Sequence, residues 1–562
     1  MIPPIPGGAA RVRWLVWSLL GVIALGALGA VRLFDAGAEL ERARAALLAG
    51  DARGALPVLA RLQGWPLIGP RAAVGLALAR ALDGAEATAV SRPSASVDFV
   101  SDLSLLLDLA WRNRRVPAVR ALVRLAERTG HPLAVVYRTA LAVEDGELAQ
   151  ARARLASDPT PFACRGLGHE IVAVLDLLEE GAVTIVRDRA SRRVGHLDAH
   201  RRLVLADGVD PAWVPPAVHA ALASAAPAPG LRLSLDLDLA RLAQSALAGR
   251  RGSVVLLDPH SGAVLAAVSD PRSAAAGGTP AFEERREPAS ISKLITTAAA
   301  LRAGLDPDAE IARMTCRGSQ RYEGGTLWCT HPAGRLQGLD QALAMSCNVA
   351  FANLGLLVGR ERLLEELRRW GFDGGELDLG PAGRILAPAG SERQLADLSI
   401  GLEATDLTPL HGALLAAVIA DRGRMPRPFL LEAAQGPLGL EPRYFDRPPP
   451  REVIDPAWLG VLSRAMQAVA AYGTAAGVAP ESFPVAMKTG TGATWHLGYH
   501  ANHIGVGPWP DPRVAFCVRV THEPSSGRVT RAARQVVGAL LAALAERLTR
   551  DIPLDHSRLA SP

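Results

Sequence analysis

The residues best placed for chemistry are a serine and a lysine three positions apart, Ser290 and Lys293. A proline, Pro288, precedes them, and an apolar, alanine-rich run that is typical of a helix follows. Positions i and i+3 share one face of a helix, so the hydroxyl and the amine can meet. A serine hydroxyl becomes a nucleophile when a nearby base takes its proton, and a neutral lysine can be that base. Ser292, the alternative nucleophile, would point to another face.

Lysine is rare in this chain, since only Lys293 and Lys488 among the 61 basic residues are lysines. Arginine serves nearly everywhere else that a positive charge is used. Arginine keeps its proton in proteins, whereas a lysine can lose it when its surroundings lower its pKa. The two lysines are therefore the strongest candidates for proton transfer.

Two further motifs follow in order. Ser346-Cys347-Asn348 combines a hydroxyl with an amide, and Lys488-Thr489-Gly490-Thr491 joins a cation to two hydroxyls at the end of a predicted strand. An amide can both donate to and accept from a peptide bond. The lysine and threonines suit a terminal carboxylate, and the glycine lets an extended ligand lie along the strand edge.

Together the three motifs resemble those of the penicillin-binding proteins, the serine D,D-transpeptidases that cross-link peptidoglycan, in a class B-like, monofunctional form. The stretches around residues 233–239, 255–266, 407–410 and 472–475 fit the same family, so the resemblance covers about residues 230–550. A single serine–lysine pair would carry no weight, but three motifs in order that include both lysines are specific.

The resemblance implies a role for each motif. Ser290 would attack a D-Ala-D-Ala stem peptide with Lys293 as base, and Ser346 would relay a proton. Asn348 would hold the substrate backbone. Lys488, Thr489 and Thr491 would bind the terminal carboxylate beside Gly490, and the N–H groups of Ser290 and Thr491 would form the oxyanion hole. It implies β-lactams as ligands and neither a cofactor nor a catalytic metal.

The pattern from residue 230 onward predicts an α+β fold of the penicillin-binding and β-lactamase type. A hairpin spans residues 253–268, and three strands are expected at residues 484–487, 496–505 and 514–521. A helical insert lies between them, and residues 529–548 form a closing helix. These elements predict an antiparallel sheet flanked by helices. Residues 551–562 are expected to form a C-terminal tail.

Residues 35–160 predict an all-α domain, because leucine and alanine recur at helical spacing. Glycines at 50, 84 and 146 are separated by 34 and 62 residues. This spacing is consistent either with a degenerate tetratricopeptide-like array or with a helical domain without repeats. Such a domain would bind protein partners, for example a glycosyltransferase of cell-wall synthesis. Residues 161–229 predict a pedestal and linker with short strands at 183–186 and 203–205.

The N-terminal stretch predicts a membrane anchor. Residues 14–31 carry no charge, Arg11 and Arg13 precede them, and mixed charge follows. The run is nearly long enough to span the bilayer, and the positive-inside rule puts residues 1–13 in the cytoplasm. The expectation is a single-pass protein (anchor at residues 14–34) of the inner membrane, with its catalytic domain on the periplasmic side. A cleaved signal peptide is the alternative.

Five cysteines form no CxxC pair (Cys164, Cys316, Cys329, Cys347 and Cys517). Outside the membrane, a disulfide between Cys316 and Cys329 is the first expectation. A metal site that also uses His331, or free thiols, are the alternatives. Cys347 lies inside a motif and is expected to serve packing.

Charge and residue content argue against two classes of function, nucleic-acid binding and β-lactam hydrolysis. The formal charge is only +5, with arginines scattered among acids, so nucleic-acid binding is not expected. No general-base glutamate is identifiable, which disfavours β-lactamase turnover. A D,D-carboxypeptidase, a β-lactam sensor and an inactive scaffold of a cell-wall complex remain as alternatives to the transpeptidase.

Overall fold

The structure is a computed structural model. It describes residues 97–157 and 166–550, apart from short gaps at 115, 271, 273–278, 387–389, 403 and 495–497, together with parts of residues 36–79. The described residues form two compact units. One holds the described part of the chain up to Ala182 and, in addition, Gln435–Arg443. The other runs from Val183 to Ala434 and resumes at Tyr444.

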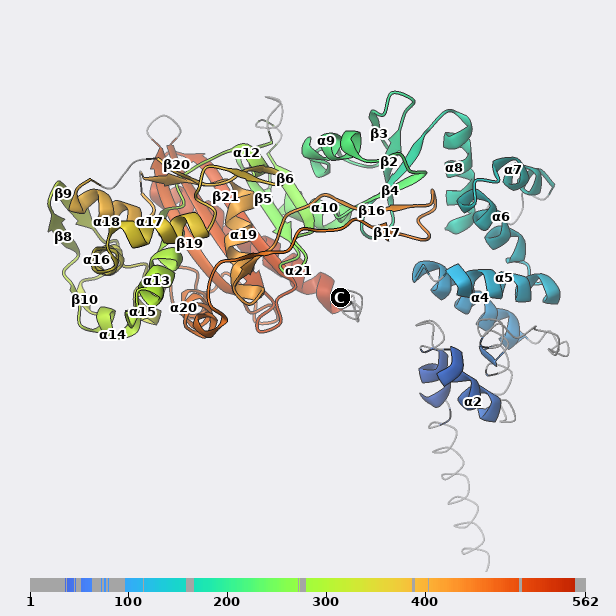
Figure 1. The fold of residues 1–562 in the computed structure, drawn as a ribbon, viewed down its shortest axis with the longest axis horizontal. Coiled ribbons are helices and arrows are strands. Elements are labelled where there is room, and N and C mark those ends of the chain that lie inside the picture. Colours follow the sequence, from blue (N-terminus) through green and yellow to red (C-terminus); the bar gives the residue numbers. More distant parts are fainter. Residues whose placement is uncertain are drawn as a thin grey trace, which may run out of the picture. The chain divides into compact units, whose positions relative to one another are not determined.

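The first unit is helical, and its successive helices can be followed in Figure 1. Their bounds are α2 Ala52–Leu62, α4 Val97–Arg112, α5 Val116–Thr129, α6 Ala134–Glu144, α7 Leu148–Ser157 and α8 Leu167–Glu179. α4 packs on α5, α5 on α6, and α6 on both α7 and α8, because apolar positions such as Leu106 and Leu122 are buried. The tetratricopeptide-like repeat stays a prediction.

The segment Gln435–Arg443 completes this helical unit although it lies far along the chain. Arg114 Nη1 donates to Gln435 Oε1 at 2.9 Å, and Leu440 N donates to Glu144 Oε1 at 3.2 Å. The Leu440 side chain is buried in the helical core. No sequence pattern indicated this pairing of distant segments.

The expected anchor at residues 14–34 lies outside the described residues. Among the helices that the structure does describe, none has both the length and the apolar character needed to cross a bilayer.

The second unit begins with a small sheet in which β16, β4, β1, β2 and β3 lie side by side in that order. Their bounds are β16 Leu431–Gln435, β4 Gly230–Leu233, β1 Thr184–Arg187, β2 Arg193–Leu197 and β3 Leu203–Leu205. The helix α9 (Ala217–Ser224) follows β3 in the chain, and its Val218 and Leu222 are buried. The short strands expected near residues 183–186 and 203–205 are therefore β1 and β3.

The main sheet has five antiparallel strands in the order β19-β20-β21-β5-β6 (Figure 1). Their bounds are β5 Gly252–Leu257, β6 Val264–Ser269, β19 Ala486–Thr494, β20 Gly498–Gly507 and β21 Val514–Glu523. The early hairpin and the three late strands confirm the predicted α+β fold. The strand β19 lies at one edge of the sheet, so its outer side is open to an added strand.

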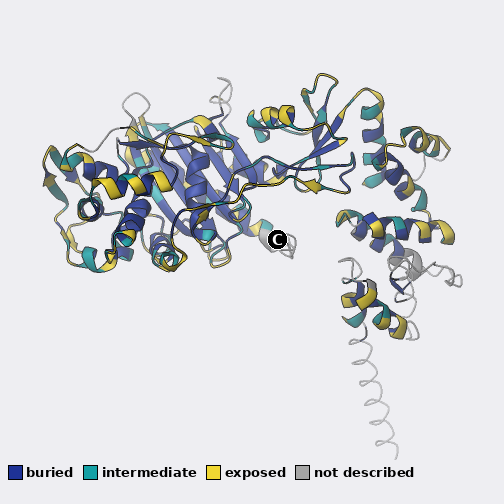
Figure 2. Ribbon diagram, in the orientation of Figure 1, coloured by how far each residue is buried: buried dark blue, intermediate teal, exposed yellow. Residues whose placement is uncertain are grey.

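Helices flank this sheet and carry the remaining motifs. Those in contact with its strands include α10 Leu237–Leu247, α19 Pro409–Ala420, α20 Leu459–Ala471 and α21 Ser526–Arg550. Those that pack mainly on other helices include α13 Lys293–Arg302, α15 Leu339–Ala344, α16 Asn348–Val358, α17 Arg360–Arg369 and α18 Glu392–Ile400. α19 and α21 pack on the central strands β20 and β21. Figure 2 shows that the sheet and α19 are buried along most of their length. A rigid, dry framework therefore carries the motif residues.

Candidate active site

Ser290 lies in a short 3-10 turn, Ala289–Ser292, that leads directly into α13, which begins at Lys293. Ser290 is half-buried and Lys293 is fully buried. Ala289, just before the serine, has a φ of 50°, a left-handed conformation that is strained for a residue with a Cβ. Ser292 is 1% exposed, and its hydroxyl packs against Gly401. Ser292 is therefore closed off, whereas Ser290 is reachable.

The Lys293 ammonium reaches across to the second motif. Its Nζ donates to the Ser346 carbonyl at 2.7 Å, to Ser346 Oγ at 3.1 Å and to Asn348 Oδ1 at 2.7 Å. Ser346 stands between α15 and α16 with a φ of 56°. This second left-handed residue turns the chain so that both its carbonyl and its hydroxyl face the lysine. The first two motifs thus meet at one nitrogen atom.

Lys488, from the edge strand β19, reaches the same serine. Its Nζ donates to Ser346 Oγ at 3.0 Å and to the Thr489 carbonyl at 2.8 Å. The Ser346 oxygen therefore accepts from both lysines. A hydroxyl has two lone pairs and one hydrogen, so the Ser346 proton remains available to a third group. The site gathers all three motifs around one hydroxyl.

Burial lowers the pKa of both lysines. For Lys293, the loss of hydration brings the pKa down to about 7. For Lys488, burial together with the nearby charge of Lys293 lowers the pKa well below its ordinary value. Among the described residues, no carboxylate lies within ion-pair distance of either amine. No carboxylate in this part of the chain therefore offsets the cost of holding charge here. Burial outweighs the opposing effect of the nearby Cys347 and Cys329 sulfurs on the Lys293 pKa, and a neutral amine is accessible near neutral pH.

The third motif lines the edge of the sheet. Thr489 Oγ1 is 2.7 Å from Thr474 Oγ1, and Thr491 Oγ1 is 3.4 Å from Thr530 Oγ1. Gly490 lies against the turn that carries the serine, since a Cβ added there would be 2.5 Å from the Pro288 carbonyl oxygen. Only glycine lets β19 approach this turn so closely.

A buried polar network holds the segment before Ser290, and sequence reasoning missed it. Arg519 Nε donates to Asn502 Oδ1 at 2.7 Å, and its other nitrogens donate to the Glu284 carbonyl at 2.6 Å and the Leu407 carbonyl at 3.0 Å. Asn502 Nδ2 donates in turn to the Glu287 carbonyl at 2.9 Å. Arg519 is 0% exposed. The available signal was an arginine in the middle of an apolar strand.

The expected Cys316–Cys329 disulfide is wrong. Both residues are free thiols, as are Cys347 and Cys517. The physical reason is that the Cys329 sulfur lies toward a third cysteine, with its Sγ 3.8 Å from Cys347 Sγ. Cys164 lies outside the described residues.

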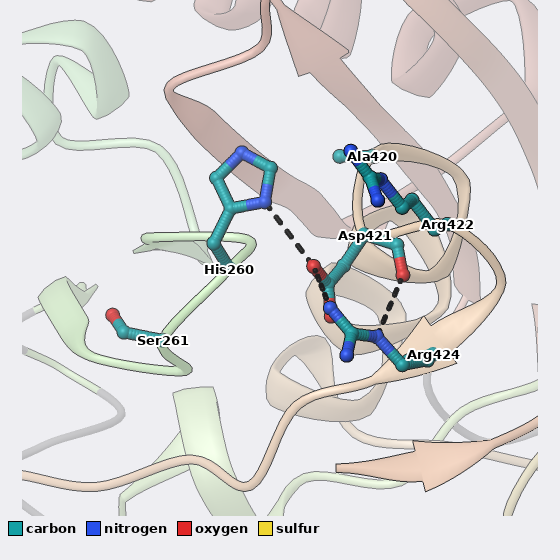
Figure 3. Close-up of a pocket in the computed structure, with 6 residues that line it drawn as sticks. All are labelled: His260, Ser261, Ala420, Asp421, Arg422 and Arg424. Carbon is teal, nitrogen blue, oxygen red and sulfur yellow. Dashed lines mark hydrogen bonds and ion pairs between the residues drawn. The ribbon is translucent and has the colours of Figure 1, made fainter. Parts of the chain in front are cut away.

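A separate polar pocket of about 380 Å³ opens at the turn between β5 and β6 and the end of α19. Figure 3 shows Asp421 between His260 and Arg424. His260 Nδ1 is 3.2 Å from Asp421 Oδ1, and Arg424 Nη2 donates to the same oxygen at 3.0 Å. None of the three motifs contributes to this pocket, whose remaining lining residues are Ser261, Ala420 and Arg422.

A serine–lysine turn beside the edge strand of an antiparallel sheet is typical of proteins that transfer acyl groups through a serine. The comparison with known protein families agrees with this class. The model of the penicillin-binding protein transpeptidase domain matches residues 252–542, which is more than half of the chain. The chain therefore belongs to this family.

Curated relatives and a solved structure are similar to about half to two thirds of this chain. The peptidoglycan D,D-transpeptidase PbpA of Mycolicibacterium smegmatis is 32% identical over 310 residues, which is 48% of this chain and 62% of the relative. The peptidoglycan D,D-transpeptidase MrdA of Acinetobacter baumannii is 25% identical over 54% of this chain and 53% of its own length. The chain thus spans less than two thirds of these relatives.

The solved D,D-transpeptidase domain of a peptidoglycan glycosyltransferase from Eggerthella lenta shares the fold. Its TM-score is 0.55 at 22% sequence identity, over 65% of this chain and 99% of that domain.

Proposed function

We propose that this protein is a peptidoglycan D,D-transpeptidase that works through an acyl-enzyme on Ser290. The observation that carries the proposal is the convergence of two buried lysines on the Ser346 hydroxyl, next to the turn that holds Ser290. Such a cluster can transfer protons in a site that excludes water. Membership of the penicillin-binding protein transpeptidase family supports its use in acyl transfer.

In the first step, the Ser290 oxygen attacks the carbonyl carbon of the penultimate D-alanine in a stem peptide. Its proton passes to the neutral amine of Lys293, whose pKa near 7 permits this role. The N–H groups of Ser290 and Thr491 receive the charge that develops on the carbonyl oxygen. The peptide C–N bond then breaks as Lys293 gives its proton to Ser346 and Ser346 gives its own proton to the departing D-alanine amine, which leaves Lys293 neutral again.

In the second step, the amine of a neighbouring stem peptide attacks the ester carbon. It gives up a proton through Ser346 to Lys293, and the C–O bond to Ser290 breaks as the serine regains its proton. Ser346 suits the relay because its oxygen accepts from both lysines while its own hydrogen stays free.

Substrate binding falls to the second and third motifs. The Asn348 amide, whose Oδ1 already accepts from Lys293, would hold the stem-peptide backbone. Thr489 and Thr491, near Lys488, would hold the terminal carboxylate while the peptide lies along the open edge of β19 beside Gly490. β-Lactams, as strained mimics of the same amide, would acylate Ser290.

Labelling with a fluorescent penicillin tests the proposal. Wild-type protein should form a stable covalent adduct, and Ser290→Ala should form none. Ser292→Ala is the matched control, because Ser292 is closed off and its hydroxyl has no hydrogen-bond partner; its labelling should match the wild type. Absence of an adduct on folded wild-type protein would refute the proposal and favour a non-catalytic scaffold.

Product analysis distinguishes a transpeptidase from a carboxypeptidase and from a β-lactam sensor. With a stem peptide and an amine acceptor, a transpeptidase releases D-alanine and forms a cross-linked amide. A carboxypeptidase releases D-alanine and leaves a shortened peptide, and a sensor acylates with neither product. We expect the cross-linked product to exceed the shortened peptide when the acceptor amine is present.

We further propose that residues 14–34 anchor the chain in the inner membrane and that the transpeptidase works on the periplasmic side. The uncharged run and the arginines before it support this topology. The helical unit would bind a glycosyltransferase partner of cell-wall synthesis. Cell fractionation checks the anchor: deletion of residues 1–34 should move the protein out of the membrane fraction.

A further inference from the structure

Four side chains that can bind a metal converge beside the active site. They are Cys316 at the end of β7 (Thr315–Cys316), Cys329 just after β9 (Gly325–Trp328), His331 in the following loop, and Cys347. One ligand atom from each lies within 4.8 Å of all the others. Cys316 and Cys347 are buried, and the other two residues are half-buried.

The spacing fits an ion better than a bond between sulfurs. With zinc–sulfur bonds of about 2.3 Å in a tetrahedron, two sulfurs stand about 3.8 Å apart. Cys329 Sγ and Cys347 Sγ are 3.8 Å apart. A disulfide would need about 2.05 Å. Three sulfurs also cannot all be satisfied by one disulfide, whereas a single ion can bind all three together with the imidazole.

Each of the three sulfurs receives a backbone N–H. Gly318 N donates to Cys316 Sγ, Val349 N donates to Cys329 Sγ and Ala350 N donates to Cys347 Sγ, each at 3.4 Å. The three sulfurs are thus each directed by a backbone donor. Hydrogen bonds of this kind orient and stabilise the ligands of a metal site.

His331 is oriented as a ligand. Its Nδ1 lies 2.8 Å from the Pro332 carbonyl oxygen, which can only accept, so Nδ1 carries the proton of the neutral ring. The lone pair is then on Nε2, which is buried and has no hydrogen-bond partner in the part of the chain that the structure describes. A backbone carbonyl on one ring nitrogen and a free lone pair on the other is the arrangement of a metal-binding histidine.

We propose that Cys316, Cys329, His331 and Cys347 bind one Zn²⁺ ion in a tetrahedral Cys₃His site. Four protein ligands close the coordination sphere, which makes the site structural rather than catalytic. Thiolate and imidazole ligands in this geometry favour zinc over the hard cations that oxygen ligands select.

The site is coupled to the catalytic motifs through two short connections. Cys347 stands between Ser346 and Asn348 in the chain and caps α16 with its sulfur. Asn348 Nδ2 donates to the Trp328 carbonyl at 2.8 Å, and Trp328 directly precedes Cys329. Bound zinc would fix the loop of residues 316–331 against the turn that presents Ser346 and Asn348 to Lys293. Zinc therefore acts as a positioning element for these two residues.

Metal analysis of the full chain, purified without chelator, tests the site. We expect about one zinc per chain in the wild type and less than a tenth of that in Cys316→Ser and Cys329→Ser. His331→Ala, in the loop, should weaken zinc binding without loss of the fold. Cys517→Ala is the matched control, because Cys517 is buried in β21 and lies outside the cluster; it should keep its zinc.

Cobalt substitution gives a second readout that needs no activity. Co²⁺ in the wild type should show sulfur-to-cobalt charge transfer and the strong visible bands of a tetrahedral site, and these should be lost in Cys329→Ser. A wild type that binds no zinc, even after reconstitution under reducing conditions, would overturn the proposal. So would a disulfide between any two of the three cysteines in a protein labelled at full rate by penicillin.

The positioning role has its own test, which rests on the proposed function. Zinc-free protein that keeps its circular dichroism spectrum should be acylated by fluorescent penicillin at least tenfold more slowly, and added zinc should restore the rate. Unchanged acylation would refute the positioning role. Because zinc content and cobalt spectra are measured without any β-lactam, failure of the metal site and failure of the acyl-transfer function give different results.

Discussion

Two polar clusters in the second unit handle charge in opposite ways. Lys293 and Lys488 are 0% exposed, and their partners are neutral oxygens of serine, asparagine and backbone. In the pocket at the β5–β6 turn, the buried carboxylate of Asp421 is paired with both His260 and Arg424, whose side chains are half-exposed. The first cluster holds its amines in a buried site without a carboxylate partner among the described residues, and the second pairs its charges next to solvent.

The difference shows where the chain accepts a cost in stability. An unpaired buried cation is expensive, and the protein reduces this cost by lowering the lysine pKa. A lysine that easily loses its proton is what a general base requires. Ion pairs near solvent do not make a group lose its proton easily, and they stabilise the folded protein only slightly. The proposed chemistry therefore belongs to the motif cluster and not to the pocket at the β5–β6 turn.

The largest expected effect follows from removal of Lys293, the proposed base. Lys293→Met should lower the rate of acylation by fluorescent penicillin by about 10³-fold or more, because general base catalysis typically contributes about 10²–10⁴-fold. Stopped-flow or gel-based labelling measures this rate. A loss below tenfold would mean that another group takes the Ser290 proton and that Lys293 only packs.

Stability should depend on pH because of the same lysine. The unfolded chain keeps the Lys293 proton up to a pKa of 10.5, whereas the folded protein releases it near 7. The unfolded state therefore binds more protons between these values, and the free energy of unfolding should rise with pH through this window, by roughly a few kcal/mol. Denaturant titrations from pH 6 to 10 should show the rise, and Lys293→Met should reduce it to the part that Lys488 contributes, because burial also lowers the pKa of Lys488. An equal rise in both proteins would assign it to other groups.

The scaffold around the cluster should show a smaller effect. Arg519→Lys keeps the charge but cannot reach Asn502, Glu284 and Leu407 at once, since the ammonium lacks the guanidinium fork. Unsatisfied buried acceptors cost about 1–3 kcal/mol, so we expect a loss of that size with about a tenfold slower acylation. Chemical denaturation and labelling measure the two quantities. Wild-type acylation in a destabilised variant would confine Arg519 to a purely structural role.

The smallest effect on stability and acylation is expected in the pocket of His260, Asp421 and Arg424. Its hydrogen bond to Asp421 raises the pKa of His260 above 6.5, so the stabilisation is full below pH 6.5 and fades as the pH rises through the raised pKa. His260→Ala should cost less than about 1 kcal/mol at pH 6 and almost nothing at pH 9. Acylation should stay within about twofold of the wild type. A clear loss of acylation would break the contrast between the two clusters.

Much of the catalytic unit was predictable because its signals are local. The apolar run in residues 253–257 and the β-branched residues of 514–521 indicated strands, and the spacing of Ser290 and Lys293 indicated one turn of a helix. The convergence of the three motifs was predictable only through the family resemblance, because no periodic pattern relates Lys293 to Ser346 or Lys488.

The remainder depends on long-range packing. Arg519 holds the segment before Ser290 across more than two hundred residues, and the segment Gln435–Arg443 joins the helical unit. The cysteines are instructive in the same way. Their positions suggested a disulfide between Cys316 and Cys329, or a metal site of these two with His331, while the fold also brings Cys347 to the same point. The position of Cys347 depends on long-range packing, which the sequence pattern does not show.

The scarcity of lysine makes the folded protein nearly inert to amine chemistry. Its two ε-amines are both fully enclosed, so acylating dyes and lysine-specific proteases should meet no target until the catalytic unit opens, the α-amine aside. Labelling or cleavage at Lys293 and Lys488 would then measure unfolding of that unit, with almost no background from the folded protein. The two lysines of the proposed site would thus also report whether the unit is folded.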